Sequence, residues 1–241
     1  MILIIYIMHK IDNQQGYGFN EKQLQVLISG FFGDGCFKTA LSGHAQFSTN
    51  SIHKEFLEYK IELLGDLVRK SGINTRINKG YKIGDIHSFS CSTSMDLAFL
   101  KSVKTDIKLS LLNDLGVALW FYDDGSLHHK NGFYNLNTHA FSEEDQIKYF
   151  LPFFKEYIGY EPKILKDRKK DGRVFSYLYF NRMASFEIAK ILNRHRIDCF
   201  SYKQWPSETI QKWSKLQAKL KSNGVECRNA HLFSRLLKKE V

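Results

Sequence analysis

Two apolar runs, at residues 27–35 and 117–125, dominate the pattern of hydrophobic and polar positions along the chain. Each run ends in Asp-Gly and is followed by a basic segment in which apolar and polar positions alternate, as they do in strands. We therefore expect each run to be the end of a helix that leads into a strand. The two aspartates, Asp34 and Asp124, are 90 positions apart. This repetition predicts one two-fold site built from two halves.

The repeat extends beyond the two runs. Ser42-Gly43 and Asn131-Gly132 lie between alternating segments and predict hairpin turns. Ser142, with Asp145 three residues later, predicts a helix start. The remaining elements are expected in pairs: helices at 51–70 and 142–158, strand pairs at 74–78 with 87–93 and at 163–166 with 174–180, and short helices at 95–100 and 184–193.

This order predicts an α+β protein with two αββαββα repeats. We place the first repeat at residues 19–103 and the second at 104–205. Residues 1–18 are expected to be an N-terminal extension, either an extra edge strand or the product of an upstream start with Met8 as the true first residue. Residues 206–241 predict a basic helical tail.

Composition narrows the class of partner. The 241 residues carry a net charge of +10 with a pI near 9.3, which favours a polyanionic partner. Residues 1–8 are apolar but too short to span a bilayer and lack the features of a secretory signal. The four cysteines have no metal-ligand spacing. We expect reduced thiols and no membrane partner. We also expect a protein that is not secreted and that is located in the cytoplasm or in the host compartment that holds its polyanionic partner.

The second run, Trp120-Phe121-Tyr122-Asp123-Asp124-Gly125, resembles the second motif of LAGLIDADG homing endonucleases. In the first run, Leu27, Asp34 and Gly35 agree with the nine-letter name of that family, and Gly33 occupies its small-residue position. Ser29 and Phe32 depart from it. The resemblance runs from about residue 21 to about residue 206.

The resemblance implies a single-chain pseudo-dimer, with the motif helices at its interface and two saddle-like antiparallel sheets. It implies a site-specific homing endonuclease that cuts both DNA strands across the minor groove and leaves short 3′ overhangs. We expect a monomer whose target is double-stranded DNA, long and only weakly palindromic, because the two halves differ in sequence.

Hydrolysis of a phosphodiester suits a divalent metal, and Mg²⁺ prefers hard oxygen ligands. Asp34 and Asp124 would each supply a carboxylate at a helix C-terminus, where the helix dipole disfavours negative charge and a cation offsets that cost. We expect Mg²⁺, with Mn²⁺ as a substitute. Gly33 and Asp123 are assigned to the same metal site as neighbours, Asp123 mainly as a cap or support for the interface.

Further residues are assigned from the resemblance and from side-chain chemistry. Family positions just outside the metal site match Lys104, for which Lys101 is an alternative, and Lys203; these lysines would orient water or stabilise developing charge. Alternate strand positions in a sheet can read bases in the major groove. The residues expected to contact DNA are Lys38, His44, Gln46, Arg76, Lys82, His128, Lys130, Asn135, Asn137, Lys163, Arg168 and Arg173.

Two other functions remain open on the same scaffold: an intron RNA maturase, which would bind intron RNA, and a DNA-binding regulator that does not cut. Retention of both Asp34 and Asp124 argues against a copy that only binds. An unrelated metal nuclease using His128, His129 and His139 lacks a suitable ligand spacing. No glycine-rich phosphate loop or nucleophile motif points to a small-molecule enzyme.

Overall fold

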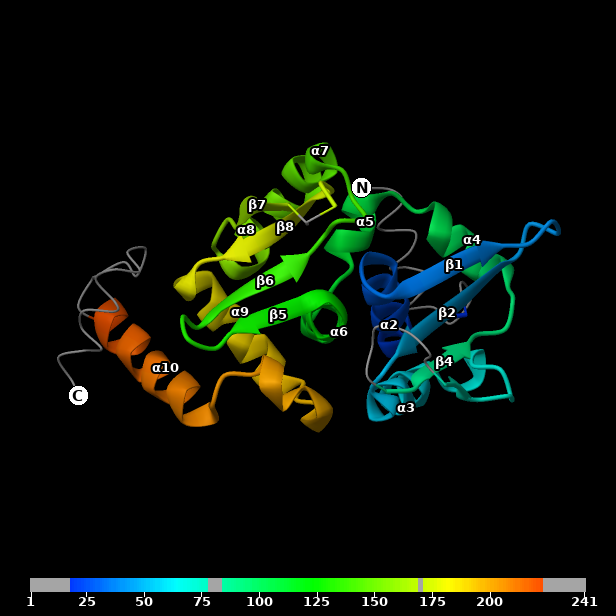
Figure 1. Cartoon of the computed structure of the whole chain (residues 1–241), viewed down its shortest axis with the longest axis horizontal. Coiled ribbons are helices and arrows are strands. Elements are labelled where there is room, and N and C mark those ends of the chain that lie inside the picture. The colour runs from blue at the N-terminus through cyan, green and yellow to red at the C-terminus, as the bar shows by residue number, and fades with distance from the viewer. Residues whose placement is uncertain (1–17, 78–83, 169–170, 223–241) are drawn as a thin grey trace. The chain divides into compact units, whose positions relative to one another are not determined.

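A computed structural model describes residues 18–77, 84–168 and 171–222 of the chain (Figure 1). Within these ranges the chain forms two compact units that divide between Asp123 and Asp124. The predicted DNA contact Lys82 lies outside the described residues, as do most of the N-terminal extension and the end of the basic tail.

Unit 1 holds the first repeat and most of the second motif helix. Its two β-hairpins form a four-stranded antiparallel sheet in the order β1-β2-β4-β3. The elements are α2 (Glu21–Phe32), β1 (Gly35–Thr39), β2 (Ala45–Ser51), α3 (Lys54–Leu64), a 3-10 turn (Gly65–Leu67), β3 (Asn74–Arg76), β4 (Ile86–Ser90), α4 (Met95–Ser102), α5 (Thr105–Ser110) and α6 (Asp114–Asp124).

Unit 2 repeats the same plan. Its antiparallel sheet has the equivalent order β5-β6-β8-β7, and its last described helix belongs to the predicted basic tail. The elements are β5 (Gly125–His128), β6 (Phe133–Asn137), α7 (Glu143–Asp145), a π-helical turn (Gln146–Phe150), α8 (Leu151–Ile158), β7 (Lys163–Arg168), β8 (Val174–Phe180), α9 (Arg182–Arg194), a 3-10 segment (Asp198–Lys203) and α10 (Ser207–Ser222).

The structure confirms the α+β class and the two αββαββα repeats. The helix expected at 51–70 is shorter, because Gly65 adopts a positive φ of 54° that ends α3 and leaves only a 3-10 turn beyond it. The helix expected at 142–158 begins as predicted, since the Ser142 hydroxyl accepts from the Asp145 backbone N–H at 3.0 Å. A π-helical turn then interrupts it.

Each sheet buries one face and leaves the other open. In β2, Ala45, Phe47 and Thr49 are buried, while the residues between them are half-exposed. In β6 the buried positions are Tyr134 and Leu136. Because side chains alternate along a strand, this pattern places the core on the helix side of each sheet.

The boundary between the units falls 20 residues after the repeat boundary predicted from the sequence at 103/104. The reason is that α6, the second motif helix, packs against α2 within unit 1. No helix in the described part of the chain is long and apolar enough to cross a membrane.

Candidate functional site

The two motif helices approach each other closely at their C-terminal ends. The rings of Phe32 on α2 and Trp120 on α6 lie 4.9 Å apart. A Cβ added at Gly33 would lie 2.8 Å from the Cβ of Asp123, a distance that real Cβ atoms do not reach. Only glycine therefore permits this approach, which is a packing role for the residue expected beside the metal.

A buried glutamine fixes the other end of this helix pair. Gln25 on α2 is 2% exposed. Its Nε2 donates to the Leu111 carbonyl at 2.9 Å, and its Oε1 accepts from the Asn113 backbone N–H at 2.9 Å. A Cβ at Gly116 would collide with the same Oε1. Gln25 thus ties α2 to the start of α6, a role that its place on an apolar helix does not reveal.

Asp123 is held by a buried lysine that the sequence analysis did not single out. The Nζ of Lys60 on α3 lies 2.8 Å from Oδ1 and 2.9 Å from Oδ2 of Asp123. The two side chains are 1% and 2% exposed. Because both oxygens accept from Lys60, the Asp123 carboxylate is engaged in the packing of α3 against α6, and this geometry does not favour it as a metal ligand.

The two aspartates next to the glycines are more accessible. Asp34 follows the α2 cap residue Gly33 and is exposed, while Asp124 ends α6 and is half-buried. The described residues contain no cluster of three or more His, Cys, Asp or Glu side chains that could hold a metal. Carboxylates supplied singly suit Mg²⁺, which commonly keeps water and substrate oxygens among its ligands.

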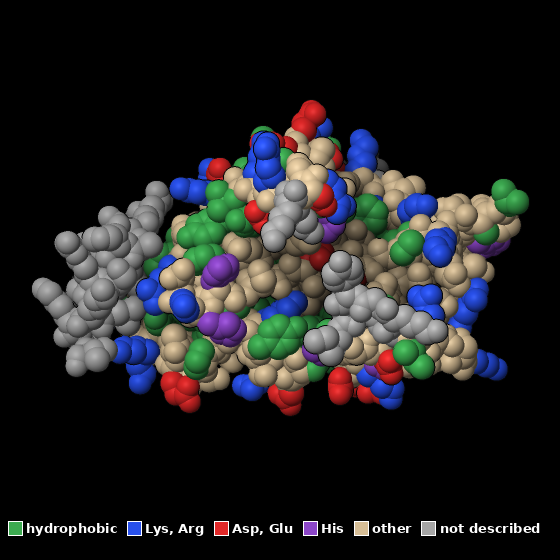
Figure 2. Space-filling model, in the orientation of Figure 1, with side chains coloured by type: hydrophobic (Ala, Val, Ile, Leu, Met, Phe, Trp, Pro, Cys, Tyr) green, Lys and Arg blue, Asp and Glu red, His purple; other side chains and the backbone are tan. Residues whose placement is uncertain are grey.

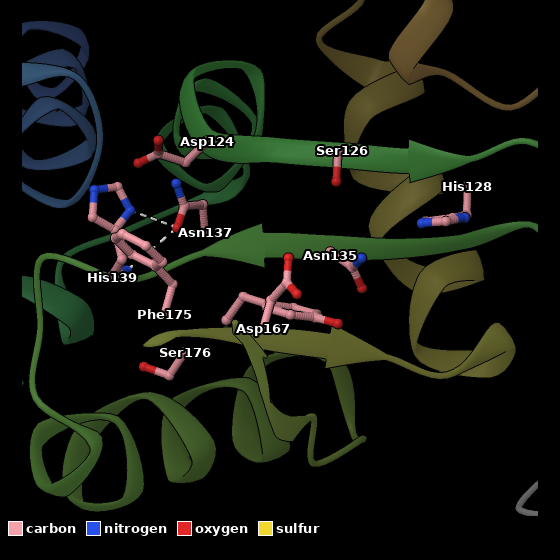
Figure 3. A pocket seen from close by; sticks show the side chains of 10 residues that line it. Asp124, Ser126, His128, Asn135, Asn137, His139, Asp167, Phe175 and Ser176 are labelled. Carbon is pink, nitrogen blue, oxygen red and sulfur yellow. Dashed lines mark hydrogen bonds between the residues drawn. The ribbon is translucent and has the colours of Figure 1, made fainter. Parts of the chain in front are cut away.

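Asp124 opens onto a pocket of about 390 Å³ over the exposed face of the unit 2 sheet (Figure 3). Polar side chains dominate its lining. The lining residues are Asp124, Ser126, His128, Asn135, Asn137, His139, Asp167, Phe175, Ser176 and Tyr177.

His139 fixes the orientation of Asn137 within this pocket. Asn137 Oδ1 lies 2.6 Å from His139 Nδ1 and also accepts from the His139 backbone N–H at 3.4 Å. The amide nitrogen of Asn137 consequently lies on the side of Asp124 (Figure 3). Asn137 is one of the residues expected to contact DNA, whereas no sequence pattern indicates that His139 orients it.

The predicted lysines occupy different environments. Lys104 is exposed at the start of α5, and Lys101 donates to Thr39 Oγ1 at 2.8 Å. Lys203 is 9% exposed, and its Nζ lies 4.9 Å from the centre of the Phe200 ring. The backbone carbonyl of Lys203 accepts a hydrogen bond from the Tyr134 hydroxyl at 2.7 Å.

A further buried lysine, Lys108, packs against the first motif helix, α2. Its Nζ is 3.8 Å from the centre of the Phe31 ring and donates to the carbonyls of Lys101 and Val103. Burial lowers the pKa of Lys108 to about 8. The contacts tie α5 to the end of α4 and to α2, so Lys108 has a structural role in this unit.

The open face of the unit 1 sheet gathers three of the expected DNA contacts. Lys38 pairs directly with Gln46, and Arg76 belongs by register to the same face. Gln46 Nε2 also donates to the Cys91 carbonyl at 3.2 Å. His44 lies in the β1–β2 turn, where its Nδ1 is 3.1 Å from Ser42 Oγ.

In unit 2 the register brings four expected contacts to the open face and leaves three elsewhere. The four are His128, Asn135, Asn137 and Lys163. Arg168 pairs with Val174, which places it on the opposite face. Lys130 is exposed in the β5–β6 turn. Arg173 lies in the β7–β8 loop, paired with Asp171 at 2.7 Å.

Comparisons with known proteins agree with this arrangement. The sequence pattern of the LAGLIDADG DNA endonuclease family matches residues 24–188. Among solved structures, the homing endonuclease I-WcaI bound to its DNA recognition sequence aligns with a TM-score of 0.66 at 18% identity, covering 83% of this chain and 92% of that one.

Structures of I-DmoI are less similar. Its complex with DNA and Mn aligns with a TM-score of 0.43 at 10% identity, over 72% of this chain and 96% of that one. No curated protein sequence matches the chain. The family match spans well over half of the sequence, and the fold is similar to that of I-WcaI. The chain therefore belongs to the LAGLIDADG DNA endonuclease family.

Proposed function

We propose that this protein is a site-specific homing endonuclease that hydrolyses a phosphodiester in each strand of double-stranded DNA with the help of a divalent metal ion. One observation carries the proposal. Gly33 and Asp123 meet where the motif helices approach. The residue after Gly33 is Asp34, and the residue after Asp123 is Asp124.

Asp34 and Asp124 would hold the metal, with Mg²⁺ as the expected ion and Mn²⁺ as a substitute. Bound there, the ion would lower the pKa of a water molecule and stabilise charge on the phosphate and the leaving oxygen. The helix C-termini that carry both aspartates favour a cation by about 0.3–1 kcal/mol each.

Residues around Asp124 pair with its neighbouring carboxylate and orient a hydrogen-bond donor towards it. Lys60 neutralises Asp123 and keeps this neighbouring carboxylate from competing with Asp124. His139 holds Oδ1 of Asn137, so the amide N–H groups of Asn137 serve as donors on the side of Asp124. Such a donor suits a phosphate oxygen or a nucleophilic water. We assign Lys104 and Lys203 to the stabilisation of developing charge.

The DNA-reading surface would consist of the open faces of the two sheets. Their polar side chains alternate along the strands, a spacing that matches base edges in a major groove. The net charge of +10 supplies attraction to phosphates. The relative I-WcaI was solved on its DNA recognition sequence, and the present chain shares its fold. No observation here favours the RNA-binding alternative.

One chain carries both motifs, so we expect a monomer to act on an asymmetric, weakly palindromic target in the compartment that holds the DNA. The residues assigned to phosphate or base contacts are Lys38, His44, Gln46, Arg76, Lys82, His128, Lys130, Asn135, Asn137, Lys163 and Arg173.

Cleavage of a duplex library with a randomised central segment tests the proposal. The wild-type protein is incubated with the library in MgCl₂, in MnCl₂ and in EDTA, and ends are sequenced. Defined double-strand ends are expected with either metal and none in EDTA. Asp34→Asn and Asp124→Asn should lower the cleavage rate by about 100-fold or more while retaining duplex binding.

Asp85→Asn is the matched control, because Asp85 is an exposed aspartate outside both motif helices. It should cut at the wild-type rate. Normal cleavage by either motif variant would overturn the metal-site assignment. Duplex binding without cleavage in both metals would overturn the proposed activity and leave a binding protein.

A further inference from the structure

The open face of the unit 2 sheet differs in chemistry from that of unit 1. Four aromatic side chains share it, from β6 and β8, and we call them the aromatic band: Phe133, Phe175, Tyr177 and Tyr179. All four are partly exposed. Register places them on one side, because Tyr179 pairs with Asn135 and Tyr177 with Asn137, while Leu178 and Phe180 face the core.

Ring contacts hold the band in place. Phe133 and Tyr179 meet edge to face at 4.9 Å, and His128 stacks on Phe133 at 4.5 Å. At the other end, His139 contacts Phe175 edge to face at 5.7 Å. Figure 2 shows hydrophobic and histidine side chains at the surface over these strands. The aromatic band is therefore an ordered, accessible surface.

Exposed apolar surface extends beyond the rings. Leu165 on β7 pairs with Tyr177 and is 38% exposed, so it adds an aliphatic side chain to the same face. A contiguous apolar surface on the solvent-exposed face of a sheet is typical of an interaction site.

Asparagines lie between the rings. Asn135 Oδ1 is buried and has no hydrogen-bond partner among the described residues. An asparagine amide pairs with adenine at N6 and N7, and the 5-methyl group of thymine is the apolar feature of the major groove. The rings beside Asn135 offer the second contact, and Asn135 offers the first when DNA binding turns its amide out to the open face, so both point to the same base pair.

The open face of the unit 1 sheet offers a different set. Apart from Ile86, the described positions on this face carry polar, cationic and small side chains, and none carries an aromatic ring, because Phe37, Phe47 and Phe89 lie on the core face. Lys38 and Arg76 suit the O6 and N7 acceptors of guanine. The two faces thus favour different bases.

We propose that the aromatic band reads thymine methyl groups, so that the half-site under unit 2 is rich in A·T pairs and the half-site under unit 1 is not. This inference rests on the proposed function, because it assumes that the open sheet faces lie in a major groove. The aromatic band becomes a specificity-determining surface.

Uracil substitution tests the proposal, since uracil is thymine without its 5-methyl group. A duplex is first selected from the randomised library by binding in EDTA, which removes cleavage from the experiment. Thymines are then replaced by uracil in one half of the selected duplex at a time. Affinity should fall about fourfold per contacted methyl in one half only.

Phe133→Ser and Tyr179→Ser together should make the protein indifferent to this replacement, whereas Phe133→Leu should keep part of the discrimination. Gln46→Ala on the unit 1 sheet is the matched control. It should bind every duplex more weakly and keep the thymine-over-uracil preference unchanged. The ring positions are partly exposed, so circular dichroism of each variant should match that of the wild type.

The outcomes separate the two proposals. A selected duplex that is bound equally well with thymine or uracil in either half overturns the role of the aromatic band and leaves the proposed endonuclease intact. Selection of single-stranded over double-stranded DNA, or of single-stranded RNA, also overturns it and points to stacking on unpaired bases. Failure to select any duplex overturns the proposed function itself.

Discussion

Lys60 of α3 and Asp123 of α6 form an ion pair that is almost wholly removed from solvent, with exposed fractions of 1% and 2%. Lys60 also lies 4.2 Å from the centre of the Phe56 ring. Asp123 stands one residue before the proposed metal ligand Asp124 and meets Gly33 on α2. One ion pair therefore joins three helices at the end of the second motif.

Lys60→Met should destabilise the protein strongly, because it leaves a buried carboxylate without this cation. Breaking one side of a buried pair costs about 3–5 kcal/mol. Chemical denaturation monitored by circular dichroism measures the loss. The double variant Lys60→Met with Asp123→Leu should recover much of it, since no buried charge remains.

Lys54→Met is the control on the same helix. Lys54 forms an exposed pair with Glu58, so its loss should leave the free energy of unfolding almost unchanged. Equal stability of the Lys60 and Lys54 variants would show that the Asp123 pair does not hold the helices together.

Gly33→Ala should lower the stability by about 1–3 kcal/mol, because its methyl group would lie 2.8 Å from the Asp123 Cβ and the motif helices would have to separate. A thermal melt measures the effect. Gly43→Ala is not a suitable control, since Gly43 has a φ of 80°. Ser110→Ala, at an exposed position on α5, serves instead and should leave the melting temperature almost unchanged. A Gly33 variant as stable as wild type would contradict the close approach.

The pH dependence of stability should reveal Lys108. Its folded pKa of about 8 lies below the ordinary value of 10.5, so the unfolded chain binds more protons between these values. The cost of burying the charge is therefore fully present below pH 8 and is relieved as the pH rises towards 10.5.

Comparison with Lys108→Met separates the contribution of Lys108 to the free energy of unfolding from that of the other groups that titrate. Relative to the variant, the wild-type protein should gain about 2 kcal/mol between pH 7 and pH 10. Denaturation series at the two pH values measure the difference. A gap that stays constant with pH would mean that Lys108 titrates normally.

His139→Phe should slow cleavage about tenfold and weaken DNA binding by a smaller factor, because the ring contact with Phe175 is kept and the hydrogen bond to Asn137 Oδ1 is lost. Single-turnover rates and binding titrations separate the two quantities. His139→Gln retains a donor and should recover part of the rate.

A double-variant comparison shows whether His139 acts through Asn137. In an Asn137→Ala background, the change His139→Phe should have no further effect on the rate. Additive losses would mean that His139 acts on the reaction independently of Asn137.

The chain alone determines the repeat and its elements. Asp-Gly after each apolar run, the Gly-containing hairpin turns and the Ser142 cap are local signals, and each is read from neighbouring residues. They predicted the two αββαββα repeats that the structure confirms. The alternation of apolar and polar residues along β2 and β6 likewise predicts which side chains point away from the core.

Only the tertiary structure decides which distant residues meet. Lys60 and Asp123 are 63 positions apart, and Gln25 and Asn113 are 88 apart. Nothing in a helical pattern distinguishes a lysine that pairs in the core from one in solvent. Register decides the rest, since a shift of one residue would move Arg168 or the aromatic band to the other face. Local patterns specify elements, whereas the site depends on long-range packing of side chains that no local pattern encodes.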